Sequence, residues 1–149
     1  MSELLIVHVG PYVFGAPVAM VSEILARPAV TRVPRTPPVV AGVAVVRGQP
    51  LAVLTCRPLL GLPVESVPVA LRWGEGRGVA LVAADQVEQL WTPGDPLPPE
   101  TWQDVVPAEA RPWIAAGYRQ ADRWIWAWPA DLPERLGSRD VEEVARSHV

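Results

Sequence analysis

Eighteen prolines in a chain of 149 residues constrain the fold more than any other feature of the sequence. Proline lacks the N–H that an α-helix needs and its ring clashes with the preceding turn, so helices rarely continue through it. Pro28, Pro34, Pro37 and Pro38 together exclude a long helix in their segment. The apolar runs between prolines are short and rich in valine, which favours strands. We therefore expect an all-β protein in which any helices are short.

Two apolar runs near the middle of the chain indicate a pair of buried strands. Residues 39–46 read Val-Val-Ala-Gly-Val-Ala-Val-Val, and residues 51–54 read Leu-Ala-Val-Leu. Arg47 and Gly48 follow the first run and predict a tight turn. Burial of the two strands does not explain a charge at this turn. Arg47 must therefore meet solvent, an internal acceptor or a partner.

Further short elements follow from the remaining pattern. Strands are expected at residues 3–9, 12–14, 67–73, 79–83, 87–91, 113–118 and 124–128, with a turn at 74–78. Helical turns are expected at 18–21, 58–62 and 140–143, residues 22–25 fit a helix or a strand, and a long loop with one helical turn is expected at 93–112. Many short strands with turn signals at close intervals predict a β-barrel or a β-sandwich.

The charge distribution argues against nucleic acid as the main ligand, because the net charge is −3. The charges are nevertheless uneven. Residues 24–64 contain no acidic residue and five arginines, Arg27, Arg32, Arg35, Arg47 and Arg57. Residues 76–149 contain seven arginines and twelve acidic residues. The five arginines either form a local basic patch on an acidic protein or are scattered around the fold.

The sequence contains no pattern for membrane insertion, secretion or disulfide bonding. No apolar run approaches the ~20 residues of a membrane-spanning helix. The first residues, Met-Ser-Glu, lack the basic cluster of a signal peptide. The single cysteine, Cys56, excludes an internal disulfide and fits a reducing cytoplasm. We expect a cytoplasmic protein that does not insert into a membrane.

Catalytic and metal-binding patterns are also missing. A nucleophilic cysteine needs a nearby base, but the only histidines are His8, in an expected strand, and His148, near the end. Two histidines and one cysteine at these spacings do not make a metal site. We expect Cys56 to be structural, and we interpret Asp85 and Asp122 as turn formers. The sequence predicts no enzyme, no metal and no cofactor.

Three tryptophans alternate along the last expected strand. Trp124, Trp126 and Trp128 would project from one face of it, because side chains alternate between the two faces of a strand. That face either packs on the core or forms a protein-binding surface, where exposed tryptophans are common hot spots.

The order of several motifs resembles the CheW-like adaptor domains of bacterial chemotaxis. The similar segments are residues 3–15, 20–25, 31–43, 45–48, 54–62, 78–87 and 122–136. The resemblance implies one domain over residues 1–149, built from two SH3-like five-stranded β-barrels side by side that meet near residues 62–68. It also implies a scaffold, without catalysis or cofactor, that bridges a CheA-type histidine kinase and the cytoplasmic tip of chemoreceptors.

The resemblance also implies which residues contact these partners. By position they are Val21, Glu23, Gly42, Arg47, Gly48 and Arg57. Two motif residues differ: the family Asn is Val45, and the family Asp is replaced within Thr55-Cys56. Without that Asp, we expect the Arg47 guanidinium to be freer to bind a carboxylate of a partner. The alternative is that Arg47 braces its turn by bonding backbone carbonyls.

The two departures also leave open a different role within the same family. The chain would then be a divergent protein-binding module of another sensory array, such as one that controls type IV pilus motility, in which one partner interaction has been lost.

Overall fold

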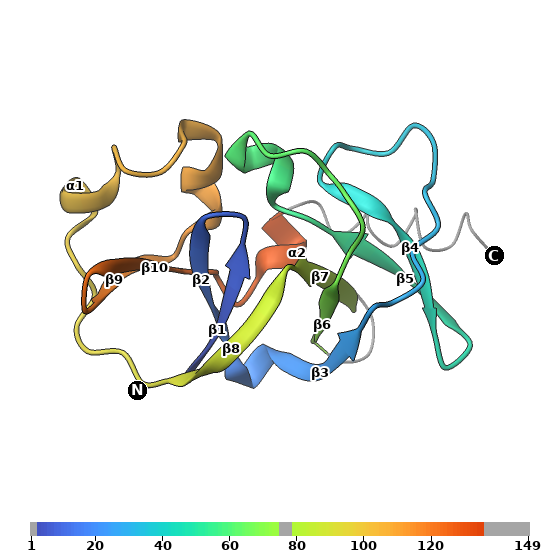
Figure 1. The fold of residues 1–149 in the computed structure, drawn as a ribbon, viewed down its shortest axis with the longest axis horizontal. Helices are drawn as coiled ribbons and strands as arrows, with labels where there is room; N and C mark the ends of the chain where they lie inside the picture. Colours follow the sequence, from blue (N-terminus) through green and yellow to red (C-terminus); the bar gives the residue numbers. More distant parts are fainter. Residues whose placement is uncertain (1–2, 75–78, 136–149) are drawn as a thin grey trace.

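The structure is a computed structural model that describes residues 3–74 and 79–135 (Figure 1). Its strands are β1 (Leu4–Val9), β2 (Tyr12–Pro17), β3 (Val21–Ala26), β4 (Val40–Val46), β5 (Gln49–Leu54), β6 (Val69–Trp73), β7 (Ala80–Ala84), β8 (Gln86–Trp91), β9 (Ala116–Gln120) and β10 (Arg123–Ala127). The short helices are η1 (Val18–Met20), η2 (Arg57–Leu60), α1 (Pro99–Trp102), η3 (Ala108–Trp113) and α2 (Leu132–Arg135).

The strands form two five-stranded sheets that lie side by side in Figure 1. Sheet I has the order β8-β1-β2-β10-β9, and sheet II has the order β3-β6-β7-β5-β4. In each sheet the third and fourth strands run parallel, and the other neighbours run antiparallel. The two sheets therefore share one internal pattern. The expected all-β fold with two five-stranded units and short helices is confirmed.

The chain crosses between the sheets at two places. It leaves sheet I through η1, builds all of sheet II, and returns to sheet I between β7 and β8 at Asp85. Residues 62–68, where the sequence placed the junction, instead connect η2 to β6 within sheet II. Proline and polar residues at 63–68 look like a connector, but only the strand pairing shows which strands that connector joins.

One large hydrophobic core joins the two sheets. It contains Phe14 of sheet I and Trp73 of sheet II, with Trp128 between them. The Trp128 ring stacks on Phe14 at 4.8 Å between centroids and meets Trp73 edge-on at 6.2 Å. Trp126 is also buried. The tryptophan face therefore packs mainly on the core, and a binding surface made of all three tryptophans is wrong.

Several local expectations are corrected by tertiary pairing. The second strand does not end at residue 14, because Gly15 and Ala16 continue to pair with β1. Residues 22–25 are strand, since β3 pairs with β6. The strand expected at 113–118 begins at Ala116, after η3, and residues 93–112 contain α1 and most of η3.

The turn at 75–78 and the helix at 140–143 lie outside the described residues. Within the described chain, none of the helices could span a membrane.

Candidate functional site

Arg47 and Glu23 form the centre of the candidate protein-binding site. Arg47 donates to the Glu23 carboxylate through Nη1 at 2.8 Å and through Nη2 at 2.5 Å. Glu23 lies on β3 and Arg47 lies in the β4–β5 turn, at opposite edges of sheet II. The loop that follows β3 also pairs with β4, through a backbone bridge between Thr31 and Val43. The pair therefore helps to close sheet II upon itself.

The turn between β4 and β5 aims the Arg47 side chain. Its two central residues, Arg47 and Gly48, have φ values of 48° and 81°. Positive φ at both positions is typical of the type I′ turns that join hairpin strands. The tight turn predicted from the sequence is thus confirmed. The expectation of a freer guanidinium is wrong, because both Nη atoms donate to Glu23. Thr55, in the segment where the family has its Asp, lies at the other end of the β4–β5 hairpin, beside Val39.

Two more polar side chains complete this group, which we call the Glu23 cluster: Glu23, Arg47, Gln49 and Arg72. Arg72 Nη1 lies 3.7 Å from Glu23 Oε1, and Arg72 Nη2 donates to Gln49 Oε1 at 3.3 Å. The hydrogen bond from Arg47 lowers the pKa of Glu23 below its ordinary value and raises that of Arg47. The carboxylate therefore stays ionised at neutral pH.

The Glu23 cluster covers one end of the core of sheet II. Leu25 and Ala70 pack in that core, and each lies two residues along its strand from Glu23 or Arg72. Alternate residues of a strand share a face, so all four side chains point to the same side. Glu23 and Arg72 are half-buried, whereas the Arg47 side chain is 64% exposed. The outer part of Arg47 thus remains open to a partner.

Val21 and Gly42 have structural roles that sequence reasoning did not find. Val21 packs against the shared core. Gly42 is buried at a bulge in β4, with φ at +155°, and a Cβ there would lie 2.3 Å from the carbonyl oxygen of Thr31. Only glycine fits such a close approach of two backbones.

Two exposed apolar side chains, Ile24 and Val45, stand close in sequence to the Glu23–Arg47 pair. They are 49% and 61% exposed. The apolar runs did not predict this exposure, because Val45 lies within a run that reads as a buried strand and residues 22–25 fit a helix or a strand. Ile24 alternates with Glu23 and Leu25 on β3, and Val45 alternates with the buried Ala44 and Val46 on β4, so both point away from the core of sheet II. Exposed aliphatic groups of this kind are ones that a protein partner can bury.

Arg57 belongs to a different part of the fold. Its Nη2 donates to Asp85 at 3.0 and 2.8 Å, and its Nη1 donates to the Pro63 carbonyl at 3.1 Å. Asp85 also accepts a hydrogen bond from the Gly10 N–H at 2.6 Å. Asp85 therefore does more than form a turn, since it ties η2 to the β1–β2 hairpin where the chain crosses between sheets.

The cysteine is structural, as the sequence predicts. Cys56 is partly buried beside Leu59, Trp113 and Trp128. Burial raises the pKa of its thiol to about 12. A thiol with so high a pKa is a poor nucleophile at neutral pH. Among the described residues there is also no group of His, Cys, Asp and Glu side chains that could hold a metal ion.

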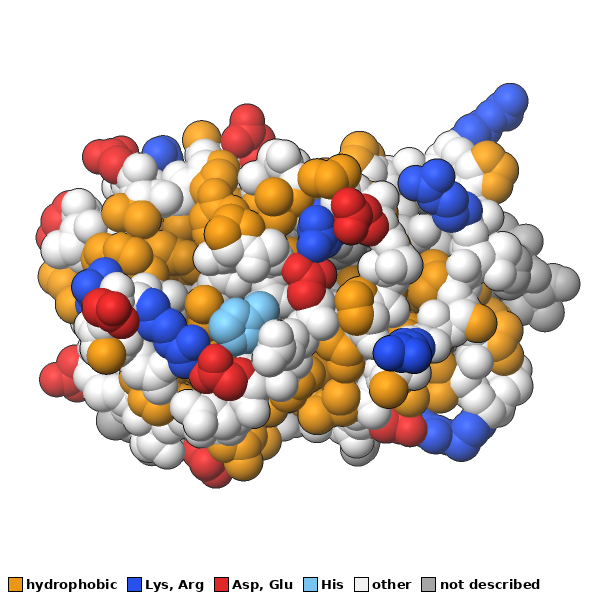
Figure 2. Space-filling view, in the orientation of Figure 1, with side chains coloured by type: hydrophobic (Ala, Val, Ile, Leu, Met, Phe, Trp, Pro, Cys, Tyr) orange, Lys and Arg blue, Asp and Glu red, His pale blue; other side chains and the backbone are white. Residues whose placement is uncertain are grey.

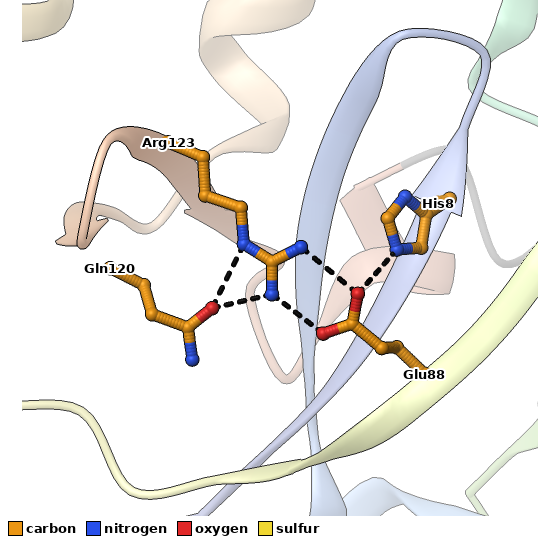
Figure 3. Close-up of polar contacts among 4 residues, drawn as sticks. All are labelled: His8, Glu88, Gln120 and Arg123. Carbon is orange, nitrogen blue, oxygen red and sulfur yellow. Dashed lines mark hydrogen bonds and ion pairs between the residues drawn. The ribbon is translucent and has the colours of Figure 1, made fainter.

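Sheet I contains a second polar cluster, made of His8, Glu88, Gln120 and Arg123 (Figure 3). Arg123 donates to both oxygens of Glu88, at 2.9 and 2.6 Å, and its Nε donates to Gln120 at 2.9 Å. His8 Nε2 lies 2.9 Å from Glu88 Oε1. The hydrogen bonds from Arg123, and then that with His8, lower the pKa of Glu88 to about 2. The sequence signals no such cluster, because its members come from three separate segments.

Comparison with known proteins agrees with this architecture. Residues 3–126 match the family model of the CheW-like domain. Curated proteins give no significant match. Fifteen chains of solved structures do match. One is the crystal structure of the scaffolding protein TtCheW from Thermoanaerobacter tengcongensis, with a TM-score of 0.68, 16% identity, and coverage of 86% of this chain and 84% of that one. At this identity the structural match shows a shared fold.

Proposed function

The chain belongs to the CheW-like domain family, and from this membership we propose that it is a non-enzymatic scaffold in chemotaxis signal transduction. In this role it couples a CheA-type histidine kinase to the cytoplasmic tip of chemoreceptors, in the cytoplasm. The observation that carries the proposal is the family match over residues 3–126. The raised pKa of Cys56 is consistent with a role that involves no chemistry.

The contact surface that we propose lies on β3 and the β4–β5 turn. It is formed by Ile24, Val45, Gly48 and the exposed part of Arg47, with Glu23 holding the guanidinium in place. An interface of this kind buries aliphatic groups at its centre and places charged groups at its rim. Because Glu23 already fixes the Arg47 guanidinium, this side chain loses less conformational entropy when a partner binds.

The other three candidates from the sequence are Val21, Gly42 and Arg57. None of them presents a largely exposed charged group like that of Arg47. Gly42 allows the close approach of Thr31 to β4, and Val21 packs on the core. Arg57 has only 17% of its side chain exposed and is paired with Asp85. We therefore assign Val21, Gly42 and Arg57 to positioning the partner-binding elements.

Binding of the purified chain to two candidate partners tests the proposal. The first titration uses the regulatory domain of a CheA-type kinase from the same source, and the second uses a soluble cytoplasmic fragment of a chemoreceptor. We expect saturable binding to both, and a ternary complex on gel filtration. The scaffold role needs both partners, so failure to bind one or both of these proteins would overturn it.

One observation favours the alternative role in another sensory array. Val45 stands at the position of the family Asn and is 61% exposed, so an apolar side chain replaces an amide at the surface. Valine cannot form the hydrogen bonds of an amide. If one of the two partners is recognised through that amide, the chain binds only the other. This alternative predicts that the chain binds only one of the two proteins, either the kinase domain or the receptor fragment.

A further inference from the structure

A groove with two arginines lies at the far end of β4 from Arg47. It consists of two adjoining depressions of about 420 and 320 Å³, which share Arg32, Ala41 and Val64. The larger one is also lined by Arg35 and by apolar residues of the loop that joins β3 to β4, and the smaller one by Glu65. We call this the Arg32–Arg35 groove. It is separate from the Glu23–Arg47 surface, because β4 runs from Val40 to Val46 between them.

The groove carries the basic charge of the acid-free stretch. Arg47 and Arg57 are paired with acids from outside that stretch, whereas Arg27, Arg32 and Arg35 form no ion pair with a described residue. Figure 2 shows basic side chains at the upper right, where this loop lies in Figure 1, and Glu65 is the acidic residue that lines the same groove. The sequence left undecided whether the five arginines form a basic patch. The structure restricts such a patch to the loop that joins β3 to β4.

Some backbone groups in and beside the groove cannot bind a ligand. Pro34, Pro37 and Pro38 have no N–H, and the Val40 N–H already donates to the Pro37 carbonyl at 2.9 Å. Thr31 uses both its N–H and its carbonyl oxygen in bonds to Val43 at 2.8 Å. Arg32 and Arg35 are the cationic groups of the groove, and its apolar lining offers a second kind of contact to a ligand. Guanidinium forks fit carboxylates in a bidentate geometry.

The backbone of the loop is also restricted in conformation. Three prolines fix their φ angles, and Arg35 stands in the left-handed region at φ 61°. Left-handed backbone in a residue other than glycine is strained, and strain of this kind concentrates at functional sites. A groove formed in advance loses little entropy on binding.

We propose that the Arg32–Arg35 groove binds an acidic peptide segment of a partner protein, in which carboxylates flank an apolar side chain. The carboxylates pair with Arg32 and Arg35, and the apolar side chain packs on Val33, Val40 and Val64. The proposal goes beyond the scaffold role, because it adds a docking site that neither the kinase nor the receptor contact requires.

A nucleic acid fits the same groove less well than a peptide. Its backbone is uniformly charged, whereas this groove has an apolar lining and an acid, Glu65, at one end. The net charge of the chain is −3, which repels a long polyanion at a distance.

Fluorescence titration of the full chain tests the proposal. The probe is a short fluorescent peptide with Asp and Glu on both sides of a leucine, and the comparison probe carries Asn and Gln in their place. We expect the acidic peptide to bind at least about tenfold tighter, with an affinity that falls as salt rises from about 50 to about 300 mM. Peptide-induced amide shifts in the NMR spectrum should concentrate in residues 30–41 and 64–67.

Three single variants locate the binding. Arg32→Gln and Arg35→Gln should each weaken acidic-peptide binding about fivefold or more, with unchanged thermal midpoints, because both side chains are exposed. Arg27→Gln is the matched control, since Arg27 is exposed, lies in the same acid-free stretch and also has positive φ, but does not line the groove. Equal affinity for both peptides, an equal loss in Arg27→Gln, or tighter binding of a single-stranded DNA of similar length overturns the proposal.

Discussion

Arg47 and Glu23 meet in a two-pronged hydrogen bond although they lie at opposite edges of one sheet. Sheet I contains the same relationship. Glu88 lies on its edge strand β8, and Arg123 begins β10, directly after the hairpin turn at the other edge. Each sheet is thus closed by a glutamate of one edge strand and an arginine of the opposite hairpin. The two sheets share one pattern of strand pairing, so the same kind of ion pair can close both of them.

Removing Arg47 should affect binding more than stability. An exposed ion pair contributes little to folding, so Arg47→Ala and Glu23→Ala should leave the thermal midpoint nearly unchanged. Arg47→Ala should weaken binding of the kinase regulatory domain or the receptor fragment about tenfold. Arg47→Lys keeps the charge but loses the fork, so it should recover only part of that binding. Differential scanning calorimetry and titration of the same samples separate the two effects. A clear loss of stability with unchanged affinity would show that Arg47 serves only to close sheet II.

Gly42→Ala should destabilise the protein by ~1–3 kcal/mol, because the new Cβ would lie 2.3 Å from the Thr31 carbonyl oxygen. Denaturant unfolding gives the value. Gly48→Ala is the control: its φ of +81° strains an alanine by ~1–2 kcal/mol, but nothing lies within 4 Å of the added Cβ. Equal effects in the two variants would show that backbone strain dominates and that the contact with Thr31 is readily relieved.

Stability should fall in acid in part because of Glu88. Its folded pKa of about 2 lies below the ordinary value of 4.5. The unfolded chain therefore takes up a proton first, and the stabilisation is full above pH 4.5 and declines as the pH falls to about 2. Screening by solvent limits it to about 1 kcal/mol. Glu88→Gln should lower the unfolding free energy at neutral pH and differ little from the native chain near pH 2. A difference that stays constant over this range would contradict the assignment.

Trp128→Ala should destabilise the protein by ~3–5 kcal/mol, since the indole fills the space between Phe14 and Trp73. Trp128→Phe should cost clearly less, because the buried Nε1 of Trp128 has no hydrogen-bond partner among the described residues and none is lost. Chemical denaturation followed by circular dichroism measures both. If the alanine variant unfolds in two separate steps, Trp128 is what couples the two sheets.

Cys56 should be unreactive in the folded protein. Its thiol has a pKa raised to about 12 by burial, so almost no thiolate is present at pH 8. Reaction with a maleimide should be at least about a hundredfold slower than in denaturant. Rapid labelling of the native chain, or loss of partner binding after labelling without unfolding, would contradict a structural role.

The local features of the chain could be predicted because they depend on neighbours in sequence. The apolar runs on both sides of Arg47-Gly48 predicted two strands and a tight turn, and Gly61 predicted the end of the helical turn η2. Residues 22–25 stayed undecided between helix and strand, because only the pairing of β3 with β6 selects the strand. The family motifs pointed to Glu23 and Arg47 separately, and no local pattern indicated that they bind each other.

The sequence by itself determined that the chain is mostly β, that the helices of the described residues are short and that no histidine lies near Cys56 along the chain, because proline placement, side-chain shape and residue counts act locally. The tertiary structure decided which acid meets which arginine. Glu23 and Arg47 are 24 residues apart, and Glu88 and Arg123 are 35 apart. Only the closure of each sheet brings them within hydrogen-bonding distance. Arg32 and Arg35 form no ion pair in the described chain, so the sequence supplied the charges and the fold decided which of them remain open to a partner.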